Sequence, residues 1–213
     1  MILVDKNIKE YVSKNELITE GYDEANVNGV SYDLTIGSIL DEKENEVDEY
    51  QLEPGEIVFI KSKEMLKIPL DILGRIAEKN SRMRQGLKID GPHYQPGHET
   101  YPYLRVQNVS GTNTVTLTKG MRVAQIIFEQ LQEQPDVTYD LQKGASFQNE
   151  EKYRGLGNYQ KEYSRQIRSK EKQALDELEN VSQKIYANVL TIMGVLVVFF
   201  SLLTIIIKHL RKL

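Results

Sequence analysis

The sequence predicts a mainly β domain followed by a helical stalk and one membrane-spanning helix. Between residues 30 and 131, short runs of β-forming residues alternate with Gly, Pro and Asn turns, as in β-barrels and sandwiches. From residue 159 the composition becomes that of a charged helix, and residues 187–207 carry no charge. The order of elements lacks the strand–helix–strand alternation of a doubly wound α/β protein.

The composition excludes several classes of function. The chain has 213 residues, and a hydrophobic fraction of 40% with a charged fraction of 27% is typical of a folded protein. It has no Cys, which excludes a disulfide scaffold, a Cys-ligated zinc site and a thiol nucleophile. The formal net charge of −4 gives no global basic surface for polymeric nucleic acid.

The β domain is expected to open with a helix over residues 5–17, in which Ile8, Tyr11 and Val12 share one face. The alternating run at residues 30–40 predicts a strand. Residues 41–49 hold six acids and one Lys, which favours a solvated hairpin loop. Further strands are expected at residues 56–68, 74–78, 101–109, 113–120 and 122–131.

Residues 134–157 are polar and rich in turn residues, which predicts a mobile tail on the β domain. Residues 159–186 form the predicted stalk. Apolar residues recur in it at heptad spacing, with Glu171 at the missing position: Ile167, Ala174, Leu178, Val181 and Ile185. This pattern indicates either a coiled coil or an amphipathic helix that lies on the β domain or the membrane surface.

The predicted span at residues 187–207 reads ANVLTIMGVLVVFFSLLTIII. A helix of about 20 apolar residues crosses the roughly 30 Å core of a bilayer. A buried core helix is the alternative, but core helices usually carry a polar stripe. Residues 208–213 form a basic tail that can anchor at the interface. The N-terminal residues lack the pattern of a signal peptide, so we expect a tail-anchored membrane protein with its main domain in the cytoplasm.

Several motifs occur in a characteristic order. They are VNGVSYDLTIG (27–37), a run from YQLEPGE to RQGL (50–87), PGHETYPYLRVQN (96–108), GMRVAQIIFEQL (120–131) and KYRGLG (152–157). Residues 1–158 thereby resemble the dCTP deaminase branch of the dUTPase-like family. The resemblance implies a dUTPase-like β-barrel of the β-clip type, a homotrimer, pyrimidine deoxynucleoside triphosphates as substrates, and Mg²⁺ accompanying the triphosphate without zinc.

A triphosphate site needs N–H groups, hydroxyls and cations around the phosphate oxygens. The segment EKNSRMRQG (78–86) offers such groups, although its cations alone would indicate only a solvated loop. The resemblance assigns substrate-binding positions here and further along the chain, with Asn80 standing where a Ser is usual: Lys79, Asn80, Ser81, Arg84, Gln125, Lys152 and Tyr153.

Deamination requires a general base that activates water. The resembled deaminases carry a Glu at the position of Arg105, and the dUTPase branch carries an Asp at the position of Gln95. An Arg cannot act as a base at neutral pH. The remaining catalytic candidates are therefore Asp90 and Glu99, together with Arg84 from the loop.

His93 and His98 flank the same turn as Glu99. These three residues could form a metal site, although exposed turn residues are the simpler interpretation. The first function hypothesis is a membrane-tethered enzyme, a dCTP deaminase or a dUTP-hydrolysing pyrophosphatase. The alternatives are a catalytically degenerate nucleotide sensor coupled to the membrane segment, and a scaffold that binds no nucleotide.

Overall fold

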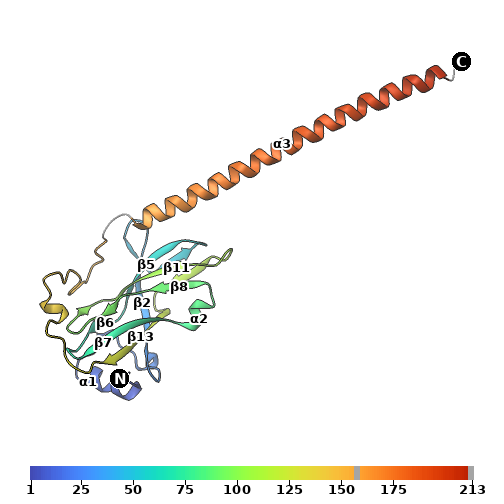
Figure 1. The fold of residues 1–213 in the computed structure, drawn as a ribbon. Helices are drawn as coiled ribbons and strands as arrows, with labels where there is room; N and C mark the ends of the chain where they lie inside the picture. The colour runs from blue at the N-terminus through green and yellow to red at the C-terminus, as the bar shows by residue number, and fades with distance from the viewer. Residues whose placement is uncertain (156–158, 211–213) are drawn as a thin grey trace. The chain divides into compact units, whose positions relative to one another are not determined.

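The computed structural model describes residues 1–155 and 159–210 (Figure 1). The chain forms two compact units, Met1–Ser164 and Arg165–Leu213. The first is mainly β, as predicted, and the described residues of the second all belong to one helix.

The main sheet of the β domain has eight strands in the order β8-β11-β5-β2-β13-β7-β9, and β3 also pairs with β2. All its neighbouring strands are antiparallel. Because a short connection joins β8 to β9, the two edges of the sheet lie close together and the sheet curls. The strands are β2 (Tyr32–Leu40), β3 (Glu46–Val47), β5 (Ile57–Ser62), β7 (Ile72–Glu78), β8 (Leu87–Asp90), β9 (His93–Tyr94), β11 (Tyr103–Asn108) and β13 (Arg122–Gln130).

Two smaller sheets complete the domain, in the orders β1-β6-β10 and β12-β4. Their strands are β1 (Leu17–Glu20), β4 (Glu49–Leu52), β6 (Met65–Lys67), β10 (Glu99–Thr100) and β12 (Val115–Thr118). The helical segments of the domain are α1 (Asp5–Ser13), α2 (Asn80–Met83) and the 3₁₀ turns η1 (Glu24–Asn26) and η2 (Tyr139–Leu141).

Strand β2 lies in the interior of the domain, and nearly all its side chains are buried, including Leu34, Ile36 and Ile39. Ile126 and Phe128 on the neighbouring β13 are buried as well. A polar residue on β2 is therefore surrounded by protein rather than by water. Such a residue needs hydrogen-bonding partners, since an unpaired buried polar group is costly.

Several sequence expectations change in detail. Residues 56–68 form two strands, β5 and β6, which lie in different sheets, rather than one strand, and residues 41–49 include the short strand β3. The first helix ends at Ser13 instead of reaching Leu17, which begins β1 and is fully buried. Pairing with β6 explains this end, because Leu17 lies opposite Lys67 in the three-stranded sheet.

Residues 137–155, which we call the covering segment, do not form the mobile tail that the sequence predicts. Their backbone is hydrogen-bonded to the residues just before β11: Tyr139 N donates to Pro96 O at 2.8 Å, and Asn149 N donates to Glu99 O of β10 at 2.7 Å. Further along, Lys61 Nζ donates to Glu151 O at 2.7 Å. The segment is thus part of the β domain.

The helix α3 (Tyr159–Leu210) begins in the last residues of the first unit and makes up the described part of the second. It has 52 residues without interruption and is about 78 Å long at 1.5 Å per residue. The predicted stalk and span are parts of this one helix. One stretch, Ser169–Leu203, is long and apolar enough to cross a membrane by length and composition. The heptad residues Leu178, Val181 and Ile185 are exposed. The Ile167 side chain, the last two residues of KYRGLG and the side chains of the basic tail lie outside the described residues.

Candidate functional site

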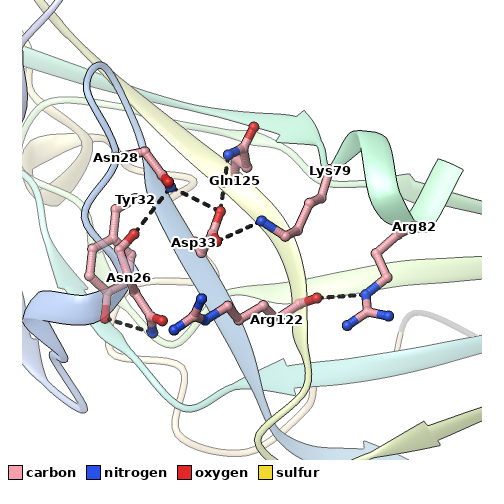
Figure 2. Close-up of polar contacts among 8 residues, drawn as sticks. All are labelled: Asn26, Asn28, Tyr32, Asp33, Lys79, Arg82, Arg122 and Gln125. Carbon is pink, nitrogen blue, oxygen red and sulfur yellow. Dashed lines mark hydrogen bonds and ion pairs between the residues drawn. The ribbon is translucent and has the colours of Figure 1, made fainter.

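A buried carboxylate lies at the centre of the polar site on β2. Asp33 is 3% exposed in its side chain, and Lys79 Nζ lies 2.6 Å from its Oδ2 atom. Gln125 on β13 is the strand partner of Asp33, and its Nε2 donates to Asp33 Oδ1 at 3.0 Å. Asn28 Nδ2 donates to the same oxygen at 3.1 Å. Figure 2 shows these side chains converging on Asp33, and we call Asn28, Asp33, Lys79 and Gln125 the Asp33 cluster.

A second set of hydrogen bonds connects the Asp33 cluster to residues 23–32. Asn28 Nδ2 also donates to Asn26 O at 3.3 Å (Figure 2). The Tyr32 hydroxyl accepts from Asp23 N at 3.0 Å. Burial raises the pKa of Tyr32 to about 12, so its hydroxyl is protonated at neutral pH. Networks of this kind hold side chains in one arrangement.

The 79–86 loop follows directly from β7 and contains α2. Two of its cations are tied to the sheet: Lys79 to Asp33, and Arg82, whose Nε donates to Arg122 O at 2.8 Å (Figure 2). Asn80, Ser81 and Arg84 are instead exposed. The loop therefore has fixed anchors and an outward face with an amide, a hydroxyl and a guanidinium.

The candidate acids do not lie together. Asp90 on β8 is the strand partner of Arg105 on β11, and Arg105 Nη2 lies 2.6 Å from Asp90 Oδ2. Both side chains of this ion pair are about one-third exposed, at 36% and 34%. Glu99 lies on β10 in the three-stranded sheet, where it lines a groove with Lys67 and Asp71.

A cavity of about 440 Å³ lies between the covering segment and strands β5, β9 and β11. Aromatic side chains form most of its wall: Phe59, Tyr94, His98, Tyr103, Tyr139 and Tyr153. The Tyr153 ring packs against Phe59 and Tyr103, with ring centroids 5.1 and 5.4 Å apart. Of the two substrate-binding candidates in this segment, Tyr153 lines the cavity, whereas Lys152 is exposed.

His98 is buried in the wall of this aromatic cavity. Its ring stacks on Tyr139 with centroids 3.9 Å apart, and its Nε2 lies 3.1 Å from Phe147 O. Burial lowers the pKa of His98 and raises that of Tyr94. Within the described part of the chain, His98 Nδ1 and the Tyr94 hydroxyl have no hydrogen-bond partner. The described residues also contain no group of three His, Asp or Glu side chains placed to hold a metal, so His93, His98 and Glu99 do not form one.

The Asp33 cluster and the aromatic cavity lie near opposite ends of β7. Tyr94 of the cavity pairs with Gly74, and Lys79 follows Gly74 by five residues. At about 3.3 Å per residue, this separation amounts to roughly 17 Å along the strand. Asp33 and Arg82 are not among the site residues predicted from the sequence, although both lie inside the family-like motifs at residues 27–37 and 50–87.

Residues 39–131 match the family model described as dCTP deaminase-like. A dCTP deaminase from Halorubrum lacusprofundi is 26% identical over 179 residues, which cover 71% of this chain and 88% of the relative. A protein named dCTP deaminase, dUMP-forming, from Coprothermobacter proteolyticus is 30% identical over 165 residues, covering 66% and 88%.

Among solved structures, the 2′-deoxycytidine 5′-triphosphate deaminase from Agrobacterium tumefaciens matches with a TM-score of 0.54 at 21% identity, over 61% of this chain. This chain spans about half of that protein, 47% of its length. The structural match shows a shared fold and confirms the predicted dUTPase-like barrel class. The 30% identity to the Coprothermobacter proteolyticus relative, over 88% of that protein, shows that the chain belongs to the dCTP deaminase-like family.

Proposed function

We propose that the β domain binds a pyrimidine deoxynucleoside triphosphate, with its phosphates on the outward face of the 79–86 loop. The observation that carries this proposal is the anchoring of Lys79 by Asp33 at 2.6 Å, with the same carboxylate held by Gln125 Nε2 at 3.0 Å. Ser81 and Arg84 of the same loop are exposed, while the first residue of the loop is held in place by the sheet. Charge-assisted hydrogen bonds from such groups are the usual means of holding phosphate oxygens, and Mg²⁺ accompanies the triphosphate.

The aromatic cavity is the part of the domain that we assign to the nucleoside. Its volume of about 440 Å³ falls in the range of small-molecule pockets, and its rings can stack on a base. Since about 17 Å of strand separates the cavity from the 79–86 loop in one chain, the proposal includes a homotrimer. In that assembly, the cavity of one chain would complete the site with the loop of its neighbour.

The curated relatives are named for dCTP deamination, and turnover of dCTP or dUTP is the corresponding proposal for this chain. One observation favours the second candidate, a nucleotide sensor without deaminase activity. Arg105 occupies the position of the deaminase Glu and is ion-paired with Asp90 at 2.6 Å. The Asp90 carboxylate is therefore occupied by the Arg105 cation, and the position of the deaminase Glu carries no acid.

Incubating the full-length protein with dCTP or dUTP and Mg²⁺, with chromatographic detection of products, tests the proposal. Uracil nucleotides from dCTP indicate deamination, and monophosphate with pyrophosphate indicates hydrolysis. Binding without products indicates the sensor, whereas the absence of binding refutes the proposal. In a chain that turns over nucleotide, Glu99→Gln or Asp90→Asn should reduce turnover about 100-fold, the effect of a lost general base. If neither variant loses activity, the water-activating group lies elsewhere.

We further propose that α3 tethers the β domain to a membrane. The support is the length and composition of Ser169–Leu203. A chain that ends at Tyr186 should stay in the supernatant after ultracentrifugation, while the full-length chain should sediment with membranes and need detergent. Release of the full-length chain by carbonate or high salt alone would contradict the tether.

A further inference from the structure

Glu64 is a buried carboxylate in the turn between β5 and β6, and the proposed nucleotide chemistry does not use it. Its residue exposure is 0%. Its Oε2 atom accepts hydrogen bonds from Thr35 N at 3.0 Å and from Ser62 Oγ at 2.5 Å, and its Oε1 accepts from Thr35 Oγ1 at 2.6 Å. Glu64 therefore binds a side chain in its own turn and both hydrogen-bond donors of a residue on β2.

Thr35 lies where the β2–β13 ladder is irregular. It is opposite Arg122, while Leu34 is opposite Ala124, so Val123 is an extra residue in a β-bulge. The Thr35 carbonyl also bonds to this turn, accepting from Lys63 N at 2.9 Å. Both backbone groups of Thr35 are thus held by residues of the β5–β6 turn.

Close backbone contact makes this arrangement possible. A Cβ atom on Gly37, which follows Thr35 by two residues, would lie 2.9 Å from Lys63 N and from Ser62 O. Real Cβ atoms essentially never come so close to backbone atoms. The glycine therefore lets the β5–β6 turn approach β2 closely enough for Glu64 to reach Thr35.

The same short stretch of β2 and β13 carries both anchors of the 79–86 loop. Arg122, the strand partner of Thr35, accepts the Arg82 Nε bond at 2.8 Å through its carbonyl. Asp33, two residues before Thr35, holds Lys79 at 2.6 Å. Figure 2 shows these two anchors side by side, with Lys79 and Arg82 reaching down from the loop.

We propose that Glu64 is a positioning residue for the 79–86 loop: by holding Thr35 it fixes the β-bulge on which Lys79 and Arg82 are anchored. A bulge redirects the residues around it, so a carboxylate that fixes the bulge also fixes the direction of the Arg122 carbonyl. The expected effect of Glu64 on nucleotide affinity rests on the proposed function, whereas its expected effect on the order of the 79–86 loop is independent of that function.

The test uses the full-length protein in detergent, with hydrogen–deuterium exchange of the loop and calorimetry with dCTP and Mg²⁺. Glu64→Ala should increase exchange in residues 79–86 at least tenfold and weaken dCTP binding at least fivefold. Glu64→Gln should stay within about threefold of the wild type in both, because its amide can accept from Thr35 N and donate to Thr35 Oγ1. Ile18→Ala, a buried substitution on β1 in another sheet, is the control for general loss of stability.

Equal loop exchange and equal affinity in Glu64→Ala and Ile18→Ala, at matched loss of melting temperature, would overturn the inference. If Glu64→Ala does not fold, Thr35→Val replaces it, since it removes only the hydroxyl donor. It should then increase loop exchange more than Ile18→Val does, and an equal effect would overturn the inference. A wild type that binds no dCTP, with the exchange effect present, refutes the proposed function and leaves the positioning role supported.

Discussion

The Asp33 cluster and the aromatic cavity handle buried polar groups in opposite ways. In the cluster, each oxygen of Asp33 has a partner within 3.1 Å, and of these partners Gln125 lies on a strand and Lys79 directly follows one. In the cavity, a ring nitrogen of His98 and the Tyr94 hydroxyl lack partners among the described residues, and one wall is the covering segment. The side chains of the cluster are held in place without a ligand, whereas the cavity contains polar groups that a ligand could hydrogen-bond.

This contrast predicts the largest loss of stability in the cluster. Asp33→Asn removes the negative partner of Lys79 while keeping the shape of the side chain, and the Lys79 charge is only 22% exposed. Breaking a largely buried pair in this way should lower the free energy of unfolding by about 2–4 kcal/mol. Urea denaturation measures the change.

Asp48→Asn is the matched control, because Asp48 forms a surface pair with Lys119. Exposed pairs contribute little to stability. Equal midpoints for Asp33→Asn and Asp48→Asn would show that the cluster is no more than a surface ion pair.

A smaller effect is expected where the covering segment joins the cavity. Gly97 has a φ of 79°, and a Cβ atom there would lie 2.3 Å from Asp140 Oδ1 and 3.2 Å from Thr138 Cβ. Gly97→Ala should therefore destabilise the domain by about 1–2 kcal/mol through the left-handed backbone alone. Thermal unfolding compares it with Gly144→Ala in the same segment, where added Cβ atoms meet nothing within 4 Å. An unchanged melting temperature in Gly97→Ala would mean that the segment shifts freely.

The smallest effect concerns pH. Burial lowers the pKa of His98 from its usual 6.5, so the folded state takes up this proton less readily than the unfolded state. The corresponding stability is present above pH 6.5 and is lost as the pH falls below it. His98→Gln should reduce the acid-induced loss of stability between pH 7.5 and 5.5, measured by urea denaturation. His93→Gln, which changes an exposed histidine on β9, is the control, and an identical pH dependence of the two variants would contradict this assignment.

Long, regular elements could be predicted from the sequence because their patterns are local. The alternating runs that became β2 and β13 were recognised, and the uninterrupted helical composition after residue 159 became α3. Strands β9 and β10, of two residues each, and the four-residue helix α2 were not predicted. Such short elements form only where a neighbouring strand or loop supplies their hydrogen bonds, and no local pattern records that neighbour.

The candidate site divides in the same way. The resemblance named Lys79 and Gln125 as substrate-binding positions, which stays a prediction, but it gave no sign that Lys79 Nζ is bonded to Asp33. Lys79 and Gln125 are 46 and 92 residues from Asp33 along the chain. Spacing could not reveal that three strands bring them together.

The most direct test of the central claim compares Arg84→Ala with Arg75→Ala by calorimetry, using dCTP or dUTP with Mg²⁺. Arg84 is exposed on the loop, with its Nε 3.2 Å from Asn80 Oδ1, and Arg75 is paired with Glu129 on the surface of β7. A charge-assisted bond contributes about 1.5–3 kcal/mol, and 1.4 kcal/mol corresponds to about a tenfold change in Kd. We predict at least tenfold weaker binding for Arg84→Ala and wild-type affinity for Arg75→Ala. Unchanged affinity in Arg84→Ala, or no binding by the wild type, would contradict a phosphate site on the 79–86 loop.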